Sequence, residues 1–179
     1  VRSRRQRQMC IRDRSWLAIR VEMTGMPELV ALFNGFGGAA SALVALAEIY
    51  SAIEAETIPK GLELYVAWTA IGLSALVGWM TLTGSLVAFA KLKGGFNILG
   101  KWRRFPTWGP SWLNPVKAIA VGTAFYMIYL SVVTPDDLRI TWALILLSCI
   151  LGVILVLPIG GADMPVVVSL LNSLSGIAA

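Results

Sequence analysis

Long apolar runs alternate with short polar connections along this chain, and within the runs the apolar positions are continuous rather than alternating. Five such runs stand out, each with at most one basic residue: 29–53, 64–90, 116–133, 140–159 and 165–179. A helix needs about 20 apolar residues to cross a bilayer, whereas membrane barrels use alternating strands of about 10 residues. The pattern predicts an all-α membrane protein, a polytopic transmembrane helix bundle of about five spans, with the last one truncated.

The composition agrees with membrane insertion. Hydrophobic residues make up 57% of the 179 residues, charged residues only 14%, and the mean hydropathy is positive, outside the averages for soluble domains. Histidine is absent, so no side chain ordinarily titrates near neutral pH. The glycine-rich stretch 35–40 follows no strand, and no catalytic or metal-ligand motif is present. We therefore expect no catalytic residue, metal site or bound cofactor in this segment itself.

Charges in the connections predict which ends of the spans share a side. Basic residues precede the first span and fill the connection 91–115, whereas acidic residues dominate the connections 54–63 and 134–139. By the positive-inside rule, the N-terminus and residues 91–115 are expected to be cytoplasmic in this multi-pass protein. Trp102, Trp108 and Trp112 lie in the basic connection, where contact with membrane lipid is a better interpretation than binding of nucleic acid.

The first residues form a basic head, 1–20, that begins VRSRRQRQMCIRDR. An arm bound to anionic lipid and a targeting segment are two interpretations of this head. A third is translated adaptor sequence, which would not belong to the fold. We expect the head to be non-native or disordered, and residues 21–179 to form the transmembrane domain.

Two spans start with the same pattern. MPELVALFNGFGG, Met26–Gly38, and MPVVVSLLNSLSG, Met164–Gly176, both contain Met-Pro, six residues, Asn, and then small residues at the first, third and fourth following positions. Proline is favourable in the first helical turn, so both helices are expected to begin at these prolines. At a rise of about 1.5 Å per residue, Asn34 and Asn172 then lie about 10 Å from the helix starts, at the same depth.

Polar side chains at that depth have two interpretations. They can be interhelical hydrogen bonds that hold the bundle together, or they can line a polar pathway. Ser74, Gly78, Thr81 and Ser85 add a stripe of small and polar residues along the second span, which packing alone could explain. Glu48, near the other end of the first span, could reach the interface or form an ion entrance.

Three stretches carry a resemblance to a known family: VEMTGMPELVALFNGFGGAASALVALAE, TLTGSLVAFAKL and IGGADMPVVVSLLNSLSG. Together they resemble the membrane domain of the beta subunit of proton-translocating NAD(P) transhydrogenase. The similarity covers most of residues 21–179 and is weakest in the connection 91–115.

The resemblance implies part of an enzyme. In that family, protons moving inward through the membrane domain drive hydride transfer from NADH to NADP⁺ between soluble domains, so this segment alone would not be catalytic. The resemblance implies NAD and NADP in the complete enzyme, an alpha subunit with the NAD(H) domain, an NADP(H) domain on the same subunit, a homodimer, and a bacterial inner (plasma) membrane.

The resemblance also implies roles for individual residues. Asn34 matches a position where many members carry a proton-relaying His and others an Asn; Asn172 matches a polar residue of the later span, and Ser85 lies on the polar face of the second span. Together with Glu48, which its position and charge suggest rather than the resemblance, these residues form the expected proton pathway. Asp163, with Gly160 and Gly161, would couple the membrane domain to the NADP(H) domain. A carboxamide is neither an acid nor a base near neutral pH, so Asn34 could only orient water or another group. A secondary transporter and a purely structural membrane subunit are the alternative functions.

Overall fold

The computed structural model describes residues 25–56, 58, 61–94, 96–98, 101–103 and 107–178. In these ranges it contains five α-helices: α2 (Met26–Glu54), α3 (Leu62–Leu92), α4 (Leu113–Val133), α5 (Leu138–Val156) and α6 (Met164–Ala178). The first four are long and apolar enough to cross a membrane, and α6 is shorter. The predicted all-α membrane bundle is confirmed. The basic head, residues 1–20, lies outside the described residues.

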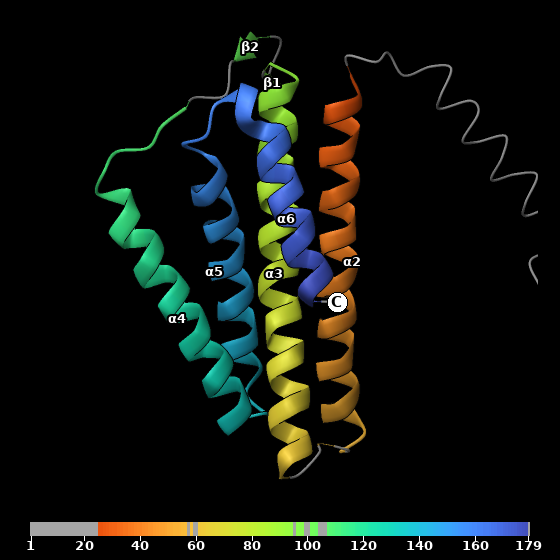
Figure 1. Cartoon of the computed structure of the whole chain (residues 1–179). Coiled ribbons are helices and arrows are strands. Elements are labelled where there is room, and N and C mark those ends of the chain that lie inside the picture. The colour runs from red at the N-terminus through yellow and green to blue at the C-terminus, as the bar shows by residue number, and fades with distance from the viewer. Residues whose placement is uncertain are drawn as a thin grey trace, which may run out of the picture.

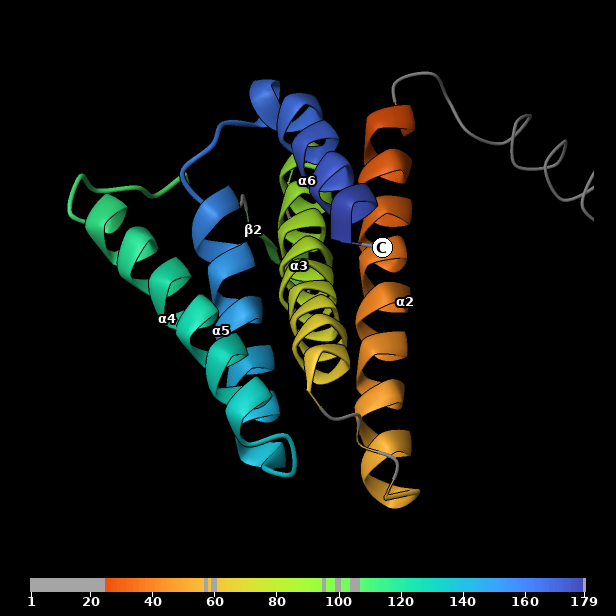
Figure 2. The same cartoon turned by 60° about the horizontal axis from the view of Figure 1, so that its bottom comes forward.

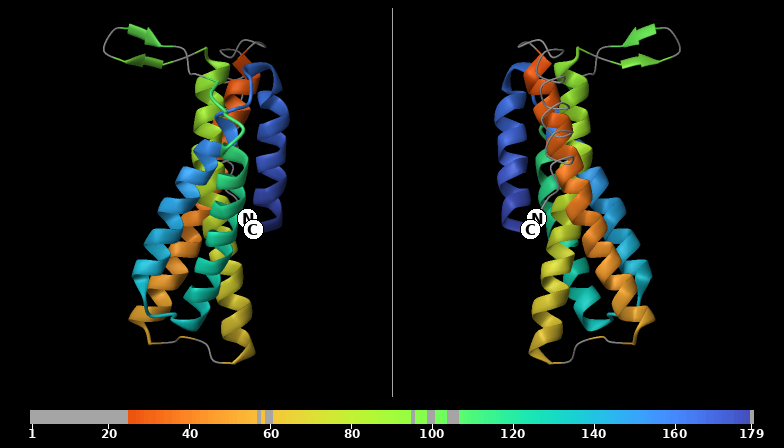
Figure 3. Two further views of the ribbon diagram at one scale, coloured as in Figure 1. Left: turned by 90° about the vertical axis from the view of Figure 1, so that its left-hand side faces the viewer. Right: turned by 90° about the vertical axis from the view of Figure 1, so that its right-hand side faces the viewer.

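Successive helices run in opposite directions (Figure 1). The start of α2, the α3–α4 connection and the α5–α6 connection share one end of the bundle, and the α2–α3 and α4–α5 connections share the other. A small antiparallel hairpin of β1 (Phe96–Ile98) and β2 (Lys101–Arg103) follows α3, and it projects sideways in Figure 3. The hydrophobic pattern did not predict this hairpin, because three-residue strands are too short to show a period.

Helix α3 is the centre of the bundle. It contacts α2, α4, α5 and α6, while α6 lies across α3 and beside α2 (Figures 1 and 2). Small residues permit two close approaches. A Cβ on Gly38 would lie 2.8 Å from the Gly78 carbonyl oxygen of α3, and Gly152 of α5 lies directly against the Met80 carbonyl. Backbones approach closely where helices carry such small residues, and Gly78 of the stripe on α3 lies at one of these approaches.

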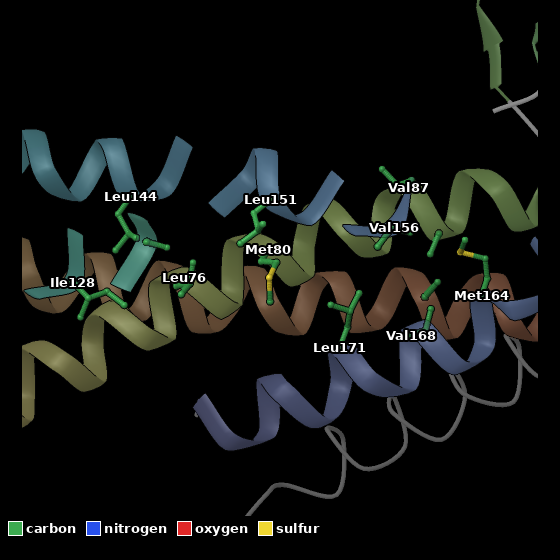
Figure 4. Packing of buried hydrophobic residues seen from close by; sticks show 13 residues of the cluster. Leu76, Met80, Val87, Ile128, Leu144, Leu151, Val156, Met164, Val168 and Leu171 are labelled. Atoms are coloured by element: carbon green, nitrogen blue, oxygen red, sulfur yellow. The ribbon is translucent and has the colours of Figure 1, made fainter. Parts of the chain in front are cut away.

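Buried apolar side chains fill the space between α3, α5 and α6 (Figure 4). Leu151 and Val156 of α5, together with Met164 and Leu171 of α6, are almost completely buried and point toward the same core. Because lipid tails are as apolar as leucine, this core stabilises the bundle through close packing rather than through removal of apolar surface from water.

The Leu151→Ala variant tests the contribution of this packing. Leu151 is 2% exposed, and truncating it would leave a cavity, so we expect a loss of about 2 kcal/mol in the free energy of unfolding. Leu146→Ala is the matched control on the same helix, because Leu146 is 64% exposed and should cost under about 0.5 kcal/mol. Denaturant titration of the complete protein in detergent measures both. Equal losses would contradict the assigned core.

The helices begin and end near the apolar runs, with one informative difference. Pro27 and Pro165 lie in the first turns of α2 and α6, as the repeated pattern predicted. The predicted span 140–159 was too long at its end, because α5 ends at Val156. Leu157 still has helical backbone angles and donates to the Val153 carbonyl, but Pro158 has no N–H, so the helical hydrogen bonds stop there.

Candidate functional site

An open groove of about 730 Å³ lies between α2 and α6, which also contact each other. The two helices that carry the repeated pattern start at the same end of the bundle and run side by side (Figures 1 and 2). Residues from both copies line the groove: Met26, Pro27, Val30, Phe33, Asn34, Gly37 and Gly38 from α2, and Pro165, Val168, Ser169, Asn172 and Ser175 from α6. The structure therefore brings the two asparagines to one cavity.

Asn34 is bonded to the central helix. Its Nδ2 donates to Ser85 Oγ of α3 over 3.0 Å, and Ser85 is completely buried. The neighbouring Gly35 permits this approach, since a Cβ there would lie 3.1 Å from Ser85 Cβ. Asn34 itself is half-buried and reaches the groove. These two predicted pathway residues, 51 positions apart in sequence, form a contact between α2 and α3.

Asn172 differs from Asn34 in its surroundings. It lines the groove but is exposed, and among the described residues its side chain makes no hydrogen bond. Ser175, three positions later, instead joins α6 to α3 through a hydrogen bond of 2.9 Å between Ser175 Oγ and Thr81 Oγ1. In the described part of the chain, Asn172 therefore does not hold helices together, whereas Ser175 does.

Thr81 and Ser175 are the polar pair that sequence reasoning missed. Thr81 was recognised in the small and polar stripe, and Ser175 only as a small residue for close packing. Thr81 and Ser85 are both completely buried and lie four positions apart, on one face of α3. That spacing was a usable signal, but the partner on α6 depends on how the helices pack.

Glu48 lies away from the groove. It is exposed on α2, fourteen positions after Asn34, which corresponds to about 21 Å along a straight helix. The structure therefore does not bring Glu48 together with Asn34, Ser85 and Asn172.

The α5–α6 connection contains Gly160 and a single 3-10 turn, η2 (Gly161–Asp163). Asp163 is exposed there, and its backbone N–H donates to the Gly160 carbonyl over 3.2 Å. Gly160 has φ −70° and ψ 157°, an extended conformation that other residues adopt. Helix α5 ends at Val156, so Gly160 and Gly161 lie within the connection rather than at the end of the helix.

Lys91, at the end of α3, caps the C-terminal end of α5. Its ammonium group is buried and donates to the carbonyls of Val156 over 3.2 Å and Ile159 over 2.8 Å, and also to that of Leu157. The last carbonyls of a helix lack intrahelical donors, and a cation is favourable beside them. Sequence reasoning had counted Lys91 only among the basic residues of the cytoplasmic connection.

Neither a metal nor a dinucleotide fits the groove. No group of acidic, cysteine or histidine side chains in the described ranges could hold a metal ion. The groove lining contains asparagine, serine and apolar residues but no Lys or Arg, so it lacks the cationic groups that commonly bind phosphates. The arrangement can hold water and orient it through carboxamide and hydroxyl groups.

Comparison with known proteins identifies the family. The sequence model of the NAD(P) transhydrogenase beta subunit matches residues 14–179. Two curated relatives from Rhodospirillum rubrum, both named NAD(P) transhydrogenase subunit beta, are 38% identical over 168 residues. The alignment covers 91% of this chain but 33% of each relative, so the chain spans about a third of their length. The chain belongs to the NAD(P) transhydrogenase beta subunit family.

Proposed function

We propose that this chain is the proton-conducting membrane part of an NAD(P) transhydrogenase. Inward proton movement through the bundle would drive hydride transfer from NADH to NADP⁺, which soluble domains outside this segment carry out. The observation that supports this proposal best is the groove between α2 and α6, where Asn34, bonded to buried Ser85, and exposed Asn172 provide polar groups within apolar helices.

The proposed pathway consists of water held in the groove and of the polar groups on its wall. Asn34 orients water through its carboxamide oxygen and its second Nδ2–H, because the bond to Ser85 uses only one of the two N–H groups. Asn172 has free hydrogen-bonding capacity toward the groove in the described structure. Neither carboxamide changes protonation, so the proton travels on water, on a carboxylate such as Glu48 or Asp163, or on a group outside this segment. Glu48 lies too far from the asparagines to bond with them and would act only as an entrance.

The proposed coupling element is the α5–α6 connection. Asp163 is an exposed carboxylate on the turn that follows Gly160 and Gly161, and α6 continues from this turn to Asn172. A displacement of α6 at Asn172 would therefore move Asp163, which would pass the movement to the NADP(H) domain of the same subunit. NAD and NADP belong to the complete enzyme, and we assign neither to this segment.

The proposed orientation of the bundle in the membrane follows from the distribution of its basic residues. The start of α2, the end of α3 and the α5–α6 connection lie at one end of the bundle. In the sequence, α2 follows the basic head and α3 leads into the basic segment 91–115. We place this end in the cytoplasm of a bacterium, with the bundle in the inner membrane. An alpha subunit with the NAD(H) domain and a second copy of the complex are the proposed partners.

Replacement of Asn172 by leucine tests the pathway directly. Since Asn172 is exposed and bonds to no described residue, Asn172→Leu should leave assembly unchanged. We expect it to slow gradient-driven proton uptake in the complete enzyme about tenfold, because an apolar side chain removes a water-binding group from the groove. Proton flux into vesicles that contain the reconstituted enzyme, measured with a pH-sensitive dye, gives the rate.

Asn114→Leu is the matched control, since Asn114 is an exposed asparagine at the start of α4, away from the groove. It should leave the flux unchanged. Normal flux in Asn172→Leu would exclude Asn172 from the pathway and favour a purely structural role for the groove. Movement of a solute other than protons through the parent protein would instead favour a secondary transporter.

A further inference from the structure

Lys91 connects the central helix to the start of the α5–α6 connection. Its three acceptors are the carbonyls of Val156, Leu157 and Ile159, at the point where α5 ends. The contact continues beyond Lys91 Nζ, since a Cβ placed on Gly161 would lie 3.8 Å from the Lys91 carbonyl oxygen. Helix α3 thus contacts the chain on both sides of Gly160, through hydrogen bonds before it and through packing against η2 after it. Gly160 comes just before the turn that contains Asp163.

The same helix also contacts the candidate pathway. Ser85, which accepts the hydrogen bond from Asn34, precedes Lys91 by six positions, or about 9 Å along the helix. A helix is stiff over that distance, so a shift or rotation of α3 at Ser85 also displaces the Lys91 ammonium group. The carbonyls that bind this ammonium group would then move with it. This route to Asp163 does not pass through α6.

We propose that Lys91 is a positioning residue that transmits displacement of α3 to the α5–α6 connection. This inference rests on the proposed function and adds a second route to it. In this route, rearrangement around Asn34 moves Ser85 and α3, and the Lys91 hydrogen bonds move the start of the connection that carries Asp163. In this proposal Lys91 neither carries the transported proton nor binds the nucleotide. Its charge and its three N–H donors suit it to bind three carbonyls at once.

The test compares gradient-driven with undriven hydride transfer in the complete enzyme. The parent enzyme and each variant are reconstituted into vesicles, and NADPH formation is followed with a proton gradient and after an uncoupler has removed it. Lys91→Met retains the length of the side chain but removes its charge and donors. We expect this variant to lower the ratio of the two rates about tenfold while the undriven rate is retained. Lys91→Arg, which donates to several carbonyls, should preserve most of the ratio.

Lys93→Met is the matched control. Lys93 is exposed two positions later, with its ammonium group 5.5 Å from the centre of the Phe89 ring, and should leave both rates unchanged. A normal ratio in Lys91→Met would overturn the inference. So would a parallel loss of both rates in proportion to the amount of assembled complex, because that result indicates structural support only.

The test also separates failure of this inference from failure of the proposed function. If Lys91→Met does not assemble, Lys91→Gln replaces it under the same criterion, because glutamine keeps an N–H donor without the charge. If the parent enzyme itself forms NADPH at the same rate with and without the gradient, the proposed function fails and this inference fails with it. A gradient-dependent parent with a normal ratio in the Lys91 variants rejects the inference alone.

Discussion

Replacing Gly152 by alanine is expected to reduce the free energy of unfolding by about 3 kcal/mol, at the upper end of the usual cost of overpacking. A Cβ at this position would meet the Met80 carbonyl and the Thr83 hydroxyl of α3, and it would lie 3.1 Å from the Gly84 backbone nitrogen. Two of these three atoms belong to the backbone, so a change of rotamer cannot relieve the contact. Helix α5 would have to move away from α3, and the shared core would open.

Denaturant titration in detergent and the yield of assembled complex in membranes measure this effect. Gly122→Ala on α4 is the control, because a Cβ there meets nothing within 4 Å. Alanine favours a helix over glycine by about 1 kcal/mol, so the control should be as stable as the parent protein or more stable. A Gly152→Ala variant with parental stability would show that α3 and α5 are not in close contact.

Asp163→Asn in the complete enzyme should slow gradient-driven NADPH formation by up to about 100-fold, toward the upper end of typical coupling factors. The substitution removes a charge but hardly changes shape. Asp163 is exposed on a 3-10 turn, so the bundle does not depend on the carboxylate for packing. Release of NADP(H) should slow together with proton pumping, because the proposal places Asp163 between the two events.

Asp136→Asn is the matched control for this variant. Asp136 is also exposed, but it lies in the α4–α5 connection at the opposite end of the bundle. Stopped-flow release of NADPH and dye-reported proton uptake should both remain at the parental rate in this control. If Asp163→Asn also left both rates unchanged, Asp163 would have no part in coupling. If only proton uptake fell, Asp163 would act in the membrane rather than at the nucleotide domain.

A double variant tests whether Lys91 and Asp163 act in series. If Lys91 transmits movement of α3 to Asp163, and Asp163 transmits it to the nucleotide domain, the two single variants interrupt the same route. The combination of Lys91→Met with Asp163→Asn should then lose less than the product of the two single effects, because residues that act in series are not additive. Independent routes would give the full product.

Much of the fold could be predicted from the sequence because the bilayer restricts the choices. A continuous apolar run of about 20 residues can satisfy its backbone in a membrane only as a helix, so the helices follow from the runs. The alternation of direction follows because each span must start where the previous one ended. Pro27 and Pro165 mark two helix starts because proline suits a first turn. The regular rise of a helix then places Asn34 and Asn172 at equal distances from these two helix starts.

What the sequence by itself determined was therefore the position of each polar residue along its helix, and what the tertiary structure decided was its partner. Partners depend on how each helix is rotated and how closely it approaches its neighbours, and several contacts fix these together. The Asn34–Ser85 hydrogen bond accompanies the close approach of α2 to α3 at Gly35 and Gly38, and the Thr81–Ser175 hydrogen bond accompanies the approach of α6 to α3 at Gly84. Lys91 meets carbonyls 65 to 68 positions away, and no local pattern encodes that contact because backbone carbonyls occur at every residue.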